Sequence, residues 1–245
     1  RYKPEDDLIS HLIAAEQEGD KLTKDELIST CILLLNAGHE ATVHTIGNGI
    51  KAILEHGKER NFLGPKYINA TVEEILRYDP PLHMFTRYAY EDVIFRNHKF
   101  KCGDQVALVI GAAGRDERIW ASPNKFNPFR QIKKNLSFGS GIHFCVGAPL
   151  ARLELVTALP IIFKKFPNIR LLDQPLYSNL YHFHGLQKLN VSPCEINIAK
   201  WQLNSAFYFF HRQKCCNIVN FYFRNQSLVK FIIRPRIFYS YFQYI

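Results

Sequence analysis

Apolar residues recur along the first part of the chain at the spacing of helices. Residues 5–18 place them among charged residues, as an amphipathic helix does. Residues 25–57 then run without a proline, and Thr23 with Glu26 has the form of a capping box at the start of a long helix. Because residues 30–38 are apolar nearly all round, we expect them to be buried through the middle of the domain.

Two further helices are predicted later in the chain. A short one covers about residues 70–78, with Thr71 and Glu74 in the pattern of a second capping box and Pro80 as its stop. The other begins just after the third cysteine of the sequence and should end at Pro160, because a proline ring interrupts helical hydrogen bonding.

The remaining patterns predict small strands and one long loop. Alternating apolar and polar residues over 87–95 and 99–110 indicate short antiparallel strands, and 168–172 and 186–191 indicate terminal strands. Residues 112–137 are rich in Pro, Asn and Arg with weak periodicity, which favours a long ordered loop of the kind that usually has a function. The predicted fold class is mainly α with small antiparallel β elements.

Charge divides the chain into two parts. Residues 196–245 hold seven of the 31 basic residues and no acidic residue, so residues 1–195 carry 24 basic against 22 acidic residues. This near-neutral balance gives nucleic-acid binding little support. We therefore treat 1–195 as the folded domain and 196–245 as an unassigned aromatic and basic tail. The tail is either an interaction extension or, the reading we favour, read-through or frame-shifted sequence.

The apolar runs also bear on location. None approaches the roughly 18 to 20 residues that a membrane span requires, and the first residues lack the features of a signal peptide. We expect a cytoplasmic protein without a membrane partner. Six scattered cysteines without Cys-x-x-Cys pairs fit reduced thiols better than a disulfide framework or a zinc site. They are Cys31, Cys102, Cys145, Cys194, Cys215 and Cys216.

The glycine-rich run FGSGIHFCVGAPLAR, residues 138–152, carries the most specific chemistry. Cys145 stands just before a predicted helix, whose unpaired N–H groups and dipole would stabilise a thiolate. Gly141 and Gly147 would let a flat ligand approach the backbone closely. His143 could reach a carboxylate at the edge of that ligand, and Phe138 supplies an apolar lid on the sulfur side.

Other readings of this run compete with a ligand role. A dinucleotide loop is disfavoured, because the third glycine of that fingerprint would fall at position 144, which is Phe. A lone cysteine is most often buried and inert. The glycines and the histidine beside Cys145 favour a functional sulfur instead.

The pattern F-x-x-G-x-H-x-C-x-G followed by APLAR resembles the haem-binding loop of the cytochrome P450 family. The resemblance implies a haem b whose iron takes the Cys145 thiolate as its axial ligand. Such a thiolate pushes electron density onto iron and favours O–O cleavage. The resemblance covers about residues 5–192 and corresponds to the carboxy-terminal half of a bacterial-type member.

Three other segments resemble the same family in the same order. Glu74 and Arg77 in EEILR match its Glu-x-x-Arg pair, which would be a buried structural pair supporting the cysteine loop. On residue pattern alone such a pair would be a weak surface salt bridge. The run RDERIWASPNKFNPFR resembles the meander before the loop, with Lys125 where an arginine is common. Arg87 falls where the family has an arginine for a haem propionate.

The run NAGHEAT resembles the oxygen-binding segment of the family. Ala37 and Gly38 would let haem and dioxygen approach the helix, and Glu40 would help to deliver protons. Ala41 stands at the position of the usual threonine, with Thr42 next to it. The hydroxyl that the family uses there is therefore absent from position 41.

The resemblance implies monooxygenation of a small organic substrate, with electrons from a ferredoxin or flavoprotein donor. Segments around Leu34 and Leu35, residues 82–85 and Phe183 would be the remaining parts of a substrate pocket, and each fits core packing equally well. Two alternatives stay open: an inactive gene fragment with little or no haem binding, and a haem-thiolate enzyme that uses peroxide.

Overall fold

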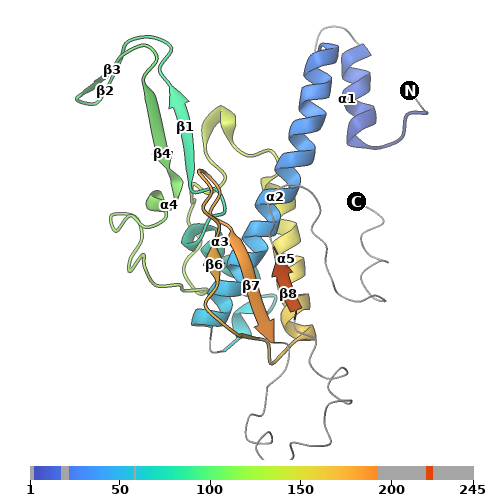
Figure 1. The fold of residues 1–245 in the computed structure, drawn as a ribbon, viewed down its shortest axis with the longest axis vertical. Coiled ribbons are helices and arrows are strands. Elements are labelled where there is room, and N and C mark those ends of the chain that lie inside the picture. Colours follow the sequence, from blue (N-terminus) through green and yellow to red (C-terminus); the bar gives the residue numbers. More distant parts are fainter. Residues whose placement is uncertain (1–2, 18–21, 58, 193–218, 223–245) are drawn as a thin grey trace, which may run out of the picture. The chain divides into compact units, whose positions relative to one another are not determined.

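A computed structural model describes residues 3–17, 22–57, 59–192 and 219–222 (Figure 1). The chain divides into two compact units, residues 1–43 and residues 44–245, and each is described by itself. Within the described residues, no helix is long and apolar enough to cross a membrane.

The first unit holds helix α1 (Leu8–Gln17) and the amino-terminal part of helix α2 (Lys24–His56). The predicted capping box is confirmed at the start of α2. The backbone N–H and the hydroxyl of Thr23 each donate to Glu26 Oε2 at 2.8 Å, and the Glu26 N–H donates back to Thr23 Oγ1 at 3.3 Å. These hydrogen bonds lower the pKa of Glu26, because they favour its charged form.

The predicted burial of residues 30–38 is wrong. Ile32, Leu33 and Leu35 are exposed, and Leu35 retains 77% of its accessible surface. An apolar surface all round a helix indicates that the helix needs neighbours on every side, but it does not indicate that this chain supplies them. The described residues leave this part of α2 largely uncovered.

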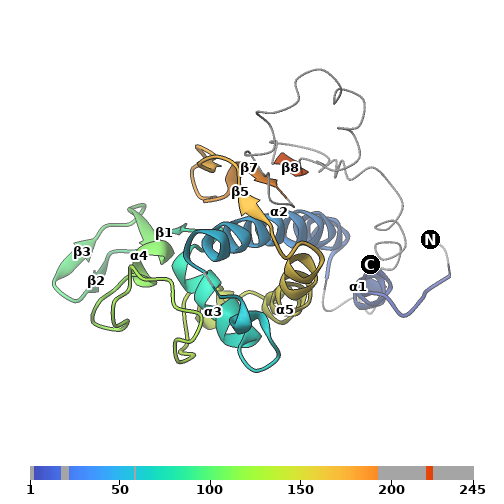
Figure 2. The ribbon, with the colours of Figure 1, turned by 90° about the horizontal axis from the view of Figure 1, so that it is seen from below.

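The second unit has a well-packed core built around helices. The carboxy-terminal part of α2 is joined there by the 3₁₀ turn η1 (Asn61–Leu63), helix α3 (Ile68–Tyr78) and helix α5 (Ala148–Lys165). Figure 2 shows α3 and α5 near each other. Their buried faces meet residues of α2 and of the last sheet. Members of this core include Ile50, Ile53, Val72, Ile75, Leu155, Leu159, Leu186 and Leu189.

Helix α3 starts differently from the prediction. Its N-cap position is Tyr67, so Thr71 lies inside the helix, and its hydroxyl donates to the carbonyl oxygens of Phe62 at 2.9 Å and Tyr67 at 3.1 Å. Glu74 turns instead toward Arg77. The predicted second capping box is therefore wrong, because tertiary partners take both side chains.

Helix α5 continues through Pro160, where the sequence predicted its end. A proline at this position has no N–H for the carbonyl one turn earlier. Leu155, Leu159 and Phe163 lie on both sides of it and are all buried in the core. Their packing holds the helix together despite the lost hydrogen bond.

Two small antiparallel sheets follow α3. Strand β1 (Met84–Tyr88) pairs with β4 (Gln105–Val109), and β2 (Val93–Phe95) pairs with β3 (His98–Phe100). The predicted strands are thus shorter than expected and are interrupted by turns. Arg96 at φ 56° and Gly103 at φ 89° take the left-handed conformation at two of these turns.

A third sheet forms around β7 (Leu186–Ser192), which pairs antiparallel with β5 (Arg170–Leu171), β6 (Leu176–Tyr177) and β8 (Val219–Tyr222). The two predicted terminal strands are confirmed as β5 and β7. Strand β8 lies in the tail, where the sequence predicted no element, and the other residues of 196–245 lie outside the described ranges.

The turn between β6 and β7 lies against α2. Gly185 there faces the imidazole of the buried His44 so closely that a Cβ atom at 185 would overlap the ring. Phe183 packs its ring 5.7 Å from that of His44. The close approach requires glycine at this turn.

The predicted long loop is confirmed. Between helix α4 (Ile110–Ala113) and the 3₁₀ turn η2 (Gly141–His143), the chain forms turns and bends without a helix or strand. This segment passes from the sheets to the glycine-rich run and contacts α3 on the way.

Candidate functional site

The glycine-rich run forms a tight loop around Cys145. We call residues 138–147 the Cys145 loop. The Cys145 N–H donates to the carbonyl of Phe138 at 2.9 Å, and the Phe144 N–H donates to the carbonyl of Gly141 at 3.1 Å. Gly139 at φ 72° and Gly141 at φ 73° both take the left-handed conformation that favours glycine. The loop brings together Phe138, Gly141, His143, Cys145 and Gly147, all five residues predicted for it.

The sulfur of Cys145 stands at the start of α5. Gly147 is the N-cap residue, and a Cβ there would lie 3.9 Å from Cys145 Sγ. Cys145 itself is half-buried. A sulfur here faces the positive end of the helix dipole and the unpaired N–H groups of the first turn, which stabilise a thiolate.

The Cys145 loop and the start of α5 carry large apolar side chains that are exposed and form an apolar rim. Ile142 retains 97% and Val146 85% of their accessible surface, and Phe144 and Leu150 are also exposed. A Cβ at Gly141 would meet nothing within 4 Å. A cysteine sulfur in a loop with such an open apolar rim fits a flat apolar macrocycle with a metal at its centre. The residues present therefore fit a haem.

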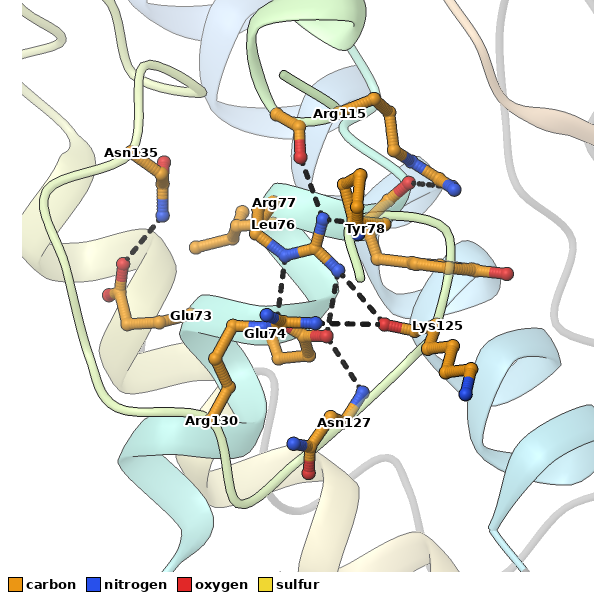
Figure 3. Close-up of polar contacts among 12 residues, drawn as sticks. Glu73, Glu74, Leu76, Arg77, Tyr78, Arg115, Lys125, Asn127, Arg130 and Asn135 are labelled. Carbon is orange, nitrogen blue, oxygen red and sulfur yellow. Dashed lines mark hydrogen bonds and ion pairs between the residues drawn. The ribbon is translucent and has the colours of Figure 1, made fainter. Parts of the chain in front are cut away.

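Glu74 and Arg77 form a buried ion pair beneath this region (Figure 3). Arg77 Nε donates to Glu74 Oε2 at 2.7 Å, and its Nη2 donates to Glu74 Oε1 at 2.8 Å. Arg77 Nη1 reaches the carbonyls of Gly114 at 2.7 Å and Pro123 at 2.8 Å. Because every charge and donor has a partner, the pair ties the long loop to α3.

Arg130 completes this network and was missed in the sequence. Its Nε donates to Glu74 Oε2 at 3.0 Å (Figure 3). Its Nη1 donates to the carbonyl of Ala121 at 2.6 Å. Lys125, which stands where the family commonly has arginine, contributes its carbonyl oxygen to Arg77 and Arg130. A guanidinium five residues farther along therefore engages Glu74. The sequence feature that could have indicated Arg130 is its place as the last residue of the run RDERIWASPNKFNPFR.

A second carboxylate of α3, Glu73, holds both sides of the Cys145 loop. Asn135 Nδ2 donates to Glu73 Oε2 at 2.9 Å before the loop, and Arg152 Nε donates to Glu73 Oε1 at 2.5 Å after it. Ser137 Oγ donates to the carbonyl of Leu76, also on α3, at 2.6 Å. Helix α3 thus anchors the Cys145 loop through the Glu73 carboxylate and the Leu76 carbonyl.

The two basic residues predicted to bind haem propionates lie on different elements. His143 is exposed in η2. Arg87 is exposed on β1, where its Nη1 donates to the carbonyl of Thr86 at 2.8 Å. Both side chains face solvent within the second unit, where a carboxylate could contact them.

The predicted oxygen-binding residues lie in the first unit, on α2. Ala37 and Gly38 are exposed, and a Cβ at Gly38 would meet nothing within 4 Å. Glu40, Ala41 and Thr42 are half-buried. All five residues that the sequence placed in this segment lie on the one helix α2.

A cavity of about 320 Å³ opens beside the carboxy-terminal end of α3. Its lining includes His83 and Met84, from the segment predicted to contact substrate, together with Asp79 and His184. Leu82 and Phe183, two other predicted pocket residues, form an isolated antiparallel bridge.

Buried polar contacts stiffen the wall of this cavity. Tyr177 donates to Asp79 Oδ2 at 2.5 Å, and His184 Nε2 lies 3.2 Å from Asp79 Oδ1. Burial, with the nearby Asp79 charge, raises the pKa of Tyr177 far above its ordinary value. Tyr177 therefore stays a neutral donor at physiological pH.

The known proteins to which this chain is similar belong to one family. The sequence profile of the cytochrome P450 family matches residues 65–174. The chain is 43% identical over 198 residues to the polyketide biosynthesis cytochrome P450 PksS of Bacillus subtilis, and this match covers 78% of the chain and 49% of the relative. It is 41% identical over 192 residues to the biotin biosynthesis cytochrome P450 of the same bacterium, covering 77% of the chain and 48% of the relative. The chain spans about half the length of the curated relatives it matches.

Solved structures agree. The chain superposes on PksS of B. subtilis with a TM-score of 0.74 at 42% identity, covering 79% of this chain and 51% of that one. For ligand-free CYP164A2 of Mycobacterium smegmatis the TM-score is 0.73 at 42% identity, covering 78% and 49%. For P450BioI in complex with an acyl carrier protein ligated to hexadec-9Z-enoic acid, it is 0.71 at 40% identity, covering 77% and 49%. The predicted fold class is confirmed.

Proposed function

This chain belongs to the cytochrome P450 family and spans about half the length of its relatives, and from this premise we propose its function. The protein to which it contributes is a haem-thiolate monooxygenase, which inserts one oxygen atom from dioxygen into an organic substrate. Residues 1–195 contribute the part of the domain that holds the haem, and residues 196–245 are not required for it.

One observation carries this proposal: the Cys145 sulfur stands at the amino-terminal end of α5, inside an open apolar rim. When bound, haem supplies iron-centred activation of dioxygen, and a cysteine ligand favours cleavage of the O–O bond. Cys145 would be the metal ligand, positioned just before the start of α5. Gly141 and Gly147 leave the backbone bare where the flat group lies.

The other residues of the chain orient the group and move protons. Arg87 and His143 pair with the carboxylates at its edge, because a guanidinium binds a carboxylate through two donors. Ala37 and Gly38 would leave the surface of α2 bare for a flat group, and Glu40 would help to deliver protons. Ala41 offers no hydroxyl there, so Thr42, substrate or water supplies it.

Partners follow from the class of chemistry. Electrons come from a ferredoxin or flavoprotein donor, and the substrate is a small organic molecule. One solved neighbour, P450BioI, is seen with an acyl carrier protein carrying a fatty acid, which is a statement about that protein. The open cavity beside His83 and Met84 supports a small substrate for this one.

Two observations favour alternatives. The exposed apolar side of α2 favours an inactive gene fragment with little or no haem binding. The alanine at position 41 favours a haem-thiolate enzyme that uses peroxide rather than dioxygen and external electrons.

The test is spectroscopic. The full chain is expressed with haem, alone and with the amino-terminal half of a relative, and the reduced carbon monoxide complex is recorded. A red-shifted band that disappears in Cys145→Ser but persists in Cys102→Ser, an exposed thiol on another segment, supports the assignment. A band that persists in Cys145→Ser contradicts it, and a chain that takes up no haem in either form supports the fragment.

A further inference from the structure

Glu73 occupies an unusual position relative to the Cys145 loop. The chain enters the loop past Asn135 and leaves it along α5 to Arg152, and both side chains donate to the Glu73 carboxylate. Arg152 makes two such contacts, Nε to Oε1 at 2.5 Å and Nη2 to Oε2 at 3.4 Å. One carboxylate therefore fastens together the two ends of the loop.

Arg152 also contacts the interior of the loop. Its guanidinium carbon lies 4.5 Å from the centre of the Phe138 ring, which is a cation–π distance. The backbone carbonyl of that same Phe138 accepts the N–H of Cys145 at 2.9 Å. A continuous set of contacts thus runs from Glu73 through Arg152 and Phe138 to the backbone of Cys145.

These contacts are separate from the Glu74 network. Glu74 faces Arg77 and Arg130 and ties down the long loop, whereas Glu73 faces Asn135 and Arg152. The side chain of Glu73 retains 16% of its accessible surface and that of Arg152 37%. A partly buried ion pair whose carboxylate accepts from two donors stabilises the fold more than an ordinary surface ion pair does.

We propose that Glu73 and Arg152 are positioning residues for Cys145, forming a clamp across the loop that fixes the sulfur at the start of α5. The clamp itself rests on the contacts above, and its effect on haem rests on the proposed function. Loosening it lets the loop open, so that the Cys145 N–H leaves the Phe138 carbonyl and the sulfur leaves the helix start. A sulfur that is no longer held at one place becomes a poorer iron ligand.

The first experiment uses the full chain without haem and measures hydrogen exchange of the Cys145 amide. Arg152→Gln is expected to speed this exchange about tenfold, as loss of charge-assisted hydrogen bonds increases local opening. Arg152→Lys keeps the charge opposite Glu73 but not the flat contact with Phe138, and should give an intermediate rate.

Arg60→Gln is the matched control. Arg60 also packs over a ring, that of Phe163 at 4.8 Å, and donates to the carbonyls of Pro167 and Ile169, near the other end of α5. It should leave the Cys145 amide unchanged. Unchanged exchange in Arg152→Gln, or equal acceleration in Arg60→Gln, overturns the clamp.

The second experiment uses haem-loaded protein. Arg152→Gln should weaken the red-shifted carbon monoxide band, with Arg152→Lys restoring much of it. An unaltered band beside faster amide exchange refutes the effect on the iron ligand. If Cys145→Ser keeps the band, the proposed function fails, and the exchange experiment still decides the clamp.

Discussion

The second unit and the amino-terminal part of α2 carry the two halves of one family signature, and they differ in how well this chain supports them. In the second unit, α3 holds the Cys145 loop through Glu73 and the Leu76 carbonyl. The segment 30–42 has an alanine in place of the usual threonine and exposes its leucines. The geometry of the Cys145 loop is set by contacts within the described residues, whereas those residues leave the segment 30–38 largely uncovered.

The largest expected effect is on the stability of the second unit and concerns the Glu74 network. Glu74→Ala leaves the buried Arg77 and Arg130 guanidinium groups without their carboxylate, and should lower the free energy of unfolding by about 3–5 kcal/mol. Chemical denaturation of the full chain measures it. Asp116→Ala is the control, since its partner Arg118 is 85% exposed and such pairs contribute about 0–1 kcal/mol. Equal losses would show that the buried network adds nothing beyond a surface pair.

The second test compares two isoleucines of one helix. Ile53→Ala removes a fully buried side chain from the core and should cost about 2–5 kcal/mol in unfolding free energy. Ile32→Ala, on the uncovered part of α2, should cost under about 0.5 kcal/mol, because its side chain is 57% exposed. Denaturant midpoints of the two variants measure the contrast. A large loss in Ile32→Ala would mean that another surface covers this segment in solution.

The third test repairs the weaker half of the signature. Ala41→Thr should raise the product formed per electron consumed, because it restores a hydroxyl next to Glu40. The thiolate band of the carbon monoxide complex should stay unchanged. The measurement requires a haem-loaded, electron-supplied protein, with Thr45→Ala, one turn farther along α2, as a comparison. Unaltered coupling would show that proton delivery does not depend on position 41.

The smallest effect concerns the start of α2. The Thr23 N–H and hydroxyl hold the pKa of Glu26 below its ordinary value of 4.5. A depressed pKa in the folded state means that the cap stabilises the helix above pH 4.5 and loses this contribution as the pH falls through the lowered value. Titration of Glu26 by NMR checks this. Thr23→Ala should move the pKa upward, and an unmoved pKa would contradict the cap.

Local signals in the sequence were sufficient for the Cys145 loop and the Thr23 cap. Both depend on residues within ten positions of one another, so pattern and spacing determine them. Arg130 could not be assigned, because its partner Glu74 lies 56 positions away and any of several loop arginines could have reached it. The prediction that the last helix ends at Pro160 was wrong for a related reason. Its local preference to end a helix was overcome by buried neighbours on both sides.

The contact between Gly185 and His44 restricts which substitutions this protein can accept during evolution. A methyl group at position 185 would overlap the buried imidazole of His44. A larger side chain at 185 therefore fits only after His44 has been replaced by a smaller residue. Gly185→Ala should be harmful alone and tolerated in the background of His44→Ala, which is strongly non-additive behaviour. The two positions, 141 residues apart, are therefore expected to vary together among related sequences, and the order of the two substitutions decides which evolutionary routes remain open.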